Sequence, residues 1–190
     1  VLKDNVTESV TIAAGKTITI DLNGHKLTNK QGEHTIINKG TLTIIDSVGT
    51  GVVDNVTHGC GALVNTGTAI LDGGTFTRSQ ENGKTKDDPG GNSWYVIKNV
   101  GTMTINDGVT VKQNGQYSSL ITNGWFSGSD NTEGATPKED TAKLTINGGT
   151  FSGGINTIKN DDYGYLTINN GTFNNVQNVV LNWNVAKING

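Results

Sequence analysis

The sequence contains very little arginine, cysteine and proline, and these shortages exclude several classes of protein. Arg78 is the one arginine and the formal net charge is −3, so no basic stripe exists to neutralise nucleic-acid phosphates. Cys60 is the one cysteine, so neither an internal disulfide nor a cysteine-based metal cluster can form. No apolar run approaches the ~20 residues that a membrane span needs. We therefore expect no nucleic-acid partner and no membrane insertion.

Helical periodicity is missing as well, and a short repeat stands in its place. The stretch "KLTINGGTF", residues 143–151, returns 22 residues later as "YLTINNGTF", residues 165–173. Repeats of about 20–45 residues are typical of solenoids, in which each unit buries its apolar face against its neighbours. Related rows occupy residues 9–28, 35–53, 62–77, 95–111, 119–153, 156–175 and 178–190.

Each row contains three short pieces with the periodicity of β-strands. In residues 41–44, "TLTI", apolar and polar side chains alternate, and Gly, Asn and Asp separate such pieces as they do at turns. Leucine-rich repeats fit poorly because no row carries a helical half, and an antiparallel sandwich does not need matching rows. The sequence predicts an all-β fold: a parallel β-helix (β-solenoid) of about seven coils of roughly 22 residues, forming a single domain over residues 1–190.

Three columns of residues recur at fixed places in the rows and predict how the coils stack. Amides at one corner of successive coils can donate in one direction and accept in the other, which forms a ladder. A second polar column and an apolar interior column accompany this ladder. The first column holds Asn38, Asn65, Asn99, Asn123, Asn160 and Asn182; the second holds Asp46, Asp72, Asn106, Asn147 and Asn169; the third holds Phe76, Val111, Phe151 and Phe173.

These rows resemble the right-handed parallel β-helices of the pectin-lyase-like superfamily. More narrowly, "ITIDLNGHKLT", residues 18–28, and the rows of the form "NxGTLTIxxGTF" are similar to repeat regions of large surface proteins from Gram-positive gut bacteria. The resemblance implies right-handed coils and a location outside the cell, at the bacterial surface. The last row stops at Gly190 without a charged or amphipathic cap, and the sequence starts at Val1 without Met or a leader, so we expect further polypeptide at both ends.

The superfamily contains lyases and hydrolases, so the paired aspartates of this sequence are candidates for general acid–base catalysis. Such catalysis needs several groups that converge on one surface. The pair Asp87-Asp88 lies in an insertion and the pair Asp161-Asp162 lies at a corner, and neither has a supporting partner in the matching place of a neighbouring row. We interpret both pairs as solvated turn residues and predict no catalytic residue and no cofactor. Residues 127–134, "SGSDNTEG", lack the acidic density of a calcium loop, so we predict no metal site.

Two insertions interrupt the rows, at residues 78–93 and 124–142, and aromatic side chains flank both. Loops that protrude from a rigid coil are common places for binding sites, and aromatic rings stack on the C–H faces of sugars. The alternative is that these rings only anchor the loops to the coil. The candidate ligand-binding residues are Trp94, Tyr95, Trp125, Phe126, Tyr163 and Tyr165.

The function predicted from these features is that of a non-catalytic adhesion or binding module on the bacterial cell surface. Its partner would be a host or dietary glycan, or a host surface protein. Two alternatives remain open: a polysaccharide-active lyase or glycoside hydrolase, and a structural stalk without a ligand. An enzyme needs a carboxylate cluster in a groove, a binding module needs exposed aromatics without one, and a stalk needs neither.

Overall fold

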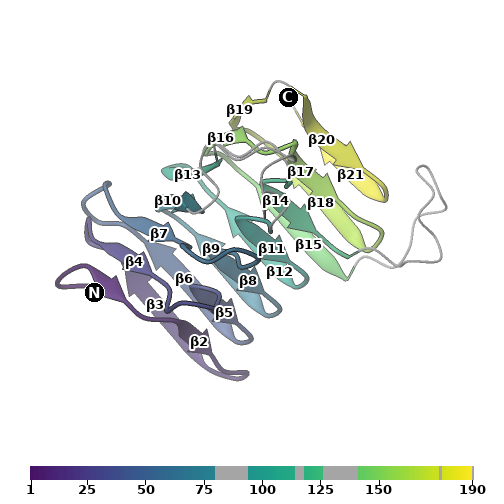
Figure 1. The fold of residues 1–190 in the computed structure, drawn as a ribbon. Helices are drawn as coiled ribbons and strands as arrows, with labels where there is room; N and C mark the ends of the chain where they lie inside the picture. The colour runs from purple at the N-terminus through teal and green to yellow at the C-terminus, as the bar shows by residue number, and fades with distance from the viewer. Residues whose placement is uncertain (80–93, 114–117, 126–140, 176, 190) are drawn as a thin grey trace.

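The chain folds into three parallel sheets that wind around one axis, as the computed structural model shows (Figure 1). The structure describes residues 1–79, 94–113, 118–125, 141–175 and 177–189. Successive strands enter the three sheets in turn, and each strand pairs with the strand one coil before and one coil after it. The predicted right-handed parallel β-helix of about seven coils is confirmed, since each sheet has 7 strands.

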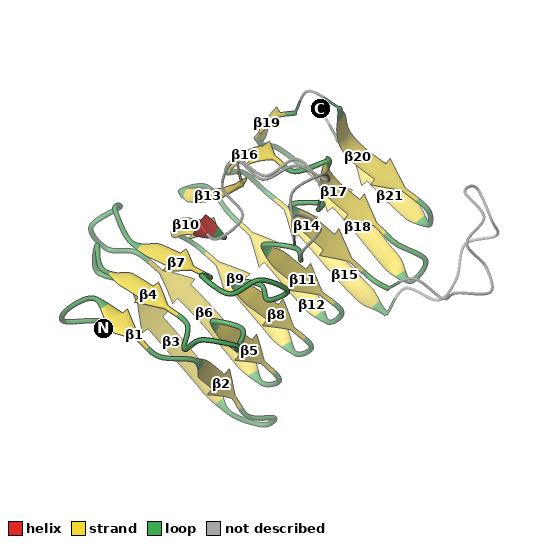
Figure 2. Cartoon of the chain, in the orientation of Figure 1, coloured by secondary structure: helices red, strands yellow, loops and turns green. Residues whose placement is uncertain are grey.

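The three faces of the solenoid are here named sheets A, B and C (Figure 2). Sheet A contains β1 (Val6–Thr7), β4 (Lys26–Thr28), β7 (Val52–Asp54), β10 (Gly74–Thr77), β13 (Val109–Gln113), β16 (Thr150–Gly153) and β19 (Thr172–Asn174). Sheet B contains β2 (Val10–Ile12), β5 (Ile36–Asn38), β8 (Leu63–Asn65), β11 (Ile97–Asn99), β14 (Ile121–Asn123), β17 (Asn156–Asn160) and β20 (Asn178–Asn182). Sheet C contains β3 (Thr17–Asp21), β6 (Thr41–Ile45), β9 (Thr68–Leu71), β12 (Thr102–Ile105), β15 (Ala142–Ile146), β18 (Gly164–Ile168) and β21 (Val185–Ile188).

The core is a stack of apolar side chains that point inward from each strand. In β12, Met103 and Ile105 are buried whereas Thr102 is exposed, which is the alternation that a half-buried strand requires. The predicted interior column on sheet A is confirmed: Phe76, Val111, Phe151 and Phe173 are partners in successive register pairs. The rings of Phe151 and Phe173 stack with centroids 4.8 Å apart. Each buried side chain of this size contributes roughly 1.5–3 kcal/mol to folding.

The predicted asparagine ladder is present at the corner where sheet B ends. Asn65 Nδ2 donates to Asn99 Oδ1 at 2.8 Å, and Asn99 Nδ2 donates to Asn123 Oδ1 at 2.8 Å. Both ends of the column continue the pattern, from Asn38 to Asn65 and from Asn123 through Asn160 to Asn182. Each amide from Asn38 to Asn160 donates to the asparagine of the next coil toward the C-terminus, so the ladder has a direction.

A glycine lies two residues beyond three of these ladder asparagines, and close backbone packing explains it. A Cβ built on Gly67 would collide with the carbonyl oxygen of Gly40 in the coil before. A Cβ built on Gly101 would collide in the same way with the carbonyl oxygen of Gly67. The coils therefore approach each other at this corner to a distance that only glycine permits.

The second polar column also forms a ladder, but the residues in it are not all those that were predicted. Asn147 donates to Asn106 at 2.9 Å, and Asn169 donates to Asn147 at 2.8 Å. Asn189, which the sequence comparison missed, adds a further rung, and Asn106 donates to the carboxylate of Asp72. The inclusion of Asp46 was wrong, because its carboxylate instead accepts the backbone N–H groups of two nearby glycines, Gly24 and Gly51. This outer ladder is exposed, and its amides donate toward the N-terminal coil.

Candidate functional site

A pocket of about 240 Å³ lies on the outward face of sheet B. Its floor comes from outward positions of β11 and β14, which are register partners. Two aromatic side chains form its walls, and a carboxylate of the following coil completes it. The lining residues are Tyr95, Lys98, Thr122, Gly124, Trp125 and Asp161.

Trp125 owes its place in this pocket to the turn immediately before it. Gly124 has φ of 94°, a backbone conformation that side chains with a Cβ rarely adopt. The chain therefore turns outward directly after β14, and Trp125 lies at the corner between sheets B and C. Its ring stacks on Tyr163 of the next coil, with centroids 4.2 Å apart and planes inclined by 10°. Trp125 remains 37% exposed, so the stack supports the ring without covering it.

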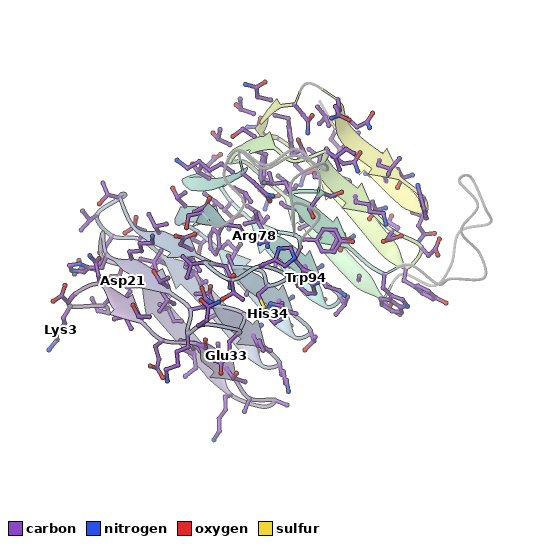
Figure 3. The ribbon with its side chains drawn as sticks, in the orientation of Figure 1. Lys3, Asp21, Glu33, His34, Arg78 and Trp94 are labelled. Atoms are coloured by element: carbon purple, nitrogen blue, oxygen red, sulfur yellow. The ribbon has the colours of Figure 1, made fainter. Side chains whose placement is uncertain are left out.

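Trp94 is placed differently and is not among the residues that line the pocket. Its ring lies 4.5 Å from that of His34, centroid to centroid, and Figure 3 shows these two side chains side by side. The Nζ of Lys98 lies 5.2 Å from the centroid of the Trp94 ring. The backbone carbonyl of Trp94 accepts a hydrogen bond from the buried guanidinium of Arg78. Trp94 therefore anchors the start of its row and also positions Lys98.

The remaining predicted site residues divide between two faces. Tyr95 lines the pocket, and Tyr163 supports it from behind Trp125. Tyr165 lies in β18 and is 36% exposed on the outward face of sheet C, where its register partners are Lys143 and Val185. The structure thus does not bring Tyr165 into the pocket. Phe126 lies outside the described residues.

The pair Asp161-Asp162 was predicted to be solvated, and this was wrong: both residues are only 2% exposed. Asp161 can be buried because the ammonium of Lys159 lies 3.0 Å from its carboxylate, and Oδ1 accepts the N–H of Asp162 at 3.3 Å. A carboxylate offers about four acceptor positions. Asp161 therefore keeps acceptor capacity on the pocket side. The other pair, Asp87-Asp88, lies outside the described residues.

Burial and neighbouring positive charges favour the neutral form of His34, the histidine that packs on Trp94. Burial lowers the pKa of His34 below its usual value of 6.5, and the positive charges of Lys98 and Arg78 act in the same direction. The N–H of Gly61 donates to Nδ1 of His34 at 2.9 Å, so Nδ1 is an acceptor and the proton of the neutral ring is on Nε2. Burial also raises the pKa of the Cys60 thiol, which makes this residue a poor nucleophile.

Sequence reasoning missed the polar half of the pocket, namely Lys98, Thr122 and Asp161. The inward columns repeat from coil to coil and could be read from aligned rows. The outward positions of sheet B do not repeat: Val64, Lys98, Thr122 and Lys159 occupy successive rungs of one column. A signal was nevertheless present, because the residue directly before each ladder asparagine must face outward on this sheet.

The described ranges contain neither a cluster of metal-ligating side chains nor a membrane-spanning helix. Within those residues, no group of three or more His, Cys, Asp or Glu side chains is placed to hold a metal ion. In the same part of the chain, no helix has the length and apolar character needed to cross a membrane.

Family assignment was sought by comparison with known proteins. No family model, no curated protein sequence and no solved structure matches this chain. The functional conclusion therefore depends on the geometry of the pocket.

Proposed function

We propose that this protein is a non-catalytic glycan-binding module, displayed outside a bacterial cell, and that the sheet B pocket receives one sugar unit. The observation that carries this proposal is the combination of two aromatic walls, Tyr95 and Trp125, with a polar floor on a rigid sheet. A pocket of about 240 Å³ is smaller than the ~300–1,000 Å³ typical of sites for drug-sized ligands. It suits a single ring or chain end better than a long segment.

The chemistry of the lining matches that of a sugar. The partly exposed Trp125 ring offers a face on which the C–H side of a pyranose can stack. Asp161 can accept hydrogen bonds from ring hydroxyl groups, and Thr122 can donate to them. Because sheet B is a hydrogen-bonded stack, these groups are held in place before the ligand arrives, which reduces the entropic cost of binding.

The burial of Asp161 in the pocket is a feature that a polysaccharide-cleaving enzyme would also show. Glycoside hydrolysis uses two carboxyl groups flanking the scissile bond. Asp161 is the one acidic residue in the described lining of the pocket, and its nearest charged neighbour is the ammonium of Lys159. This arrangement supports binding rather than acid–base chemistry, so we retain the binding proposal.

A direct test is a glycan array probed with the protein clustered on beads, since single-site sugar binding is weak and clustering supplies avidity. We expect binding to a subset of glycans and its loss in Trp125→Ala. Tyr165→Ala is the matched control, because it removes another aromatic ring of nearly equal exposure from a different face. Binding that survives Trp125→Ala in a folded protein contradicts the assignment of the pocket. Failure of the clustered protein to bind any glycan would favour the stalk.

A further inference from the structure

Lys98 is the feature of the pocket that sugar hydroxyl groups do not explain. Its register partners on sheet B are Val64 and Thr122, so neither adjacent rung offers it a counter-charge. Among the residues that the structure describes, no carboxylate forms an ion pair with Lys98. Its ammonium lines the pocket and contacts the face of Trp94. Within the described part of the chain, the pocket therefore contains a positive charge without a direct ion-pair partner.

The position of this charge is constrained by its surroundings. Trp94 lies below the ammonium, with 5.2 Å between Nζ and the ring centroid, and Trp94 is itself packed against His34. A cation over an aromatic face at an exposed site is stabilised less than a cation in a well-aligned, charge-assisted hydrogen bond to an oxyanion. The ring thus orients Lys98 without satisfying its three donors.

The second cation of this face is already neutralised. Lys159 lies two rungs from Lys98, a separation of roughly 10 Å at the usual strand spacing. Its ammonium is 3.0 Å from the carboxylate of Asp161 and 4.8 Å from the ring of Trp183. The charges of Lys159 and Asp161 cancel locally, so among the described lining residues Lys98 carries the charge that is not paired.

We propose that the pocket selects a sugar carrying a single negatively charged group, a carboxylate or a sulfate ester, and that Lys98 is the residue that recognises it. The ring of that sugar stacks on Trp125 while Asp161 accepts from its hydroxyl groups. This inference rests on the proposed function. An isolated or terminal acidic sugar fits better than an acidic polymer, because the chain has a net charge of −3 and the pocket contains a carboxylate of its own.

The experiment compares sugars that differ only in this charge. A panel of oligosaccharide cores is immobilised in neutral, terminally sialylated and terminally sulfated forms, with polygalacturonate as a polyanion arm, and clustered protein is applied at low and high salt. We expect anionic termini to bind about tenfold more tightly than their neutral parents, the effect of one charge-assisted contact, and the preference to shrink at high salt. The sialylated and sulfated arms distinguish a carboxylate from a sulfate ligand.

Two charge variants decide the role of Lys98. Lys98→Gln should reduce the binding of anionic cores to the level of their neutral parents, which abolishes the anionic preference. Lys112→Gln removes the same charge from the same coil, but on the exposed face of β13 in sheet A, and should keep the preference.

Equal binding of neutral and anionic cores, or a preference that survives Lys98→Gln, overturns the inference and leaves the proposed function standing. Tighter binding of polygalacturonate than of any terminal acidic sugar also overturns it. Binding to no member of the panel removes the proposed function itself.

Discussion

Single amide side chains hold the register of this molecule. Asn99 is fully buried, and its Nδ2 donates to Asn123 and to two backbone carbonyls, those of Gly101 and Lys143. Its Oδ1 accepts from Asn65 in the coil before. A shift of one residue would place this amide on the outward face and an apolar side chain in the corner, so the ladder and the apolar columns specify the same alignment.

The first prediction concerns this residue. Asn99→Leu removes the side-chain acceptor of Asn65 and the side-chain donor to Asn123 from the interior, so the free energy of unfolding should fall by roughly 1–3 kcal/mol. Urea denaturation followed by circular dichroism measures the change. Asn147→Leu in the exposed outer ladder is the matched control, and we expect it to cost less than about 1 kcal/mol because water can replace its hydrogen bonds. Equal losses from both variants would contradict the structural role of the inner ladder.

A second residue-scale prediction follows from His34. Its pKa is lowered in the folded protein, so its neutral form is favoured there relative to the unfolded chain. The resulting stability is fully present above pH ~6.5, the unfolded value, and is lost as the pH falls toward the lowered folded pKa. Protonation of Nδ1 also removes the hydrogen bond from Gly61. Urea midpoints measured from pH 7.5 to 5.5 should decline in the native protein and stay level in His34→Gln, whereas His25→Gln should retain the decline.

At the scale of elements, the turn after β14 decides whether the pocket has its aromatic wall. Gly124 combines φ of 94° with a close approach to the next coil, since a Cβ at this position would lie 2.8 Å from the backbone nitrogen of Gly164. The turn thus directs Trp125 outward while the two coils remain in contact. Its geometry depends on a neighbouring coil rather than on local sequence alone.

The third prediction tests that turn. Gly124→Ala adds a contact that is too close to a strained backbone, so we expect a loss of about 2–3 kcal/mol in unfolding free energy and a loss of glycan binding. Gly15→Ala is the control, because Gly15 also has positive φ, at 76°, but a Cβ there meets nothing within 4 Å. We expect about 1–2 kcal/mol for this control. Urea denaturation measures both, and an equal effect would show that the approach to Gly164 is unimportant.

The interior of the elements could be predicted from the sequence, whereas the pocket could be predicted only in part. Stacking forces each interior side chain to match those directly above and below it, so a column such as Phe151 and Phe173 is visible in aligned rows. Outward side chains carry no such constraint. Aromatic residues near the insertions were evident from their position, but the burial of Asp161 depends on the location of Lys159, and no repeat encodes that pair.

At the scale of the whole molecule, we predict that the protein does not cleave polysaccharides. We expect no release of reducing ends or unsaturated products from polygalacturonate, or from common plant and mucin glycans, with or without Ca²⁺. The reason is that Asp161 is paired with Lys159 and is the one acidic residue in the described lining. Sensitive product assays check this, with Asp161→Asn as the control. Product formation that disappears in this variant would support the enzyme alternative.

The alignment of hydrogen bonds along one axis gives the molecule an unusual response to tension. Coil-to-coil backbone bonds and both amide ladders lie parallel to the axis that separates the first coil from the last (Figure 1). A pull along this axis loads every junction between coils in series, and each junction consists of strand pairs in three sheets, so we expect the coils to detach one at a time. A coil without an insertion frees roughly 22 residues when it detaches, or about 75 Å of extended chain, and the two coils with insertions free more. Under load the protein lengthens in discrete steps, and it would act as an extensible tether for any ligand bound to the coils that remain.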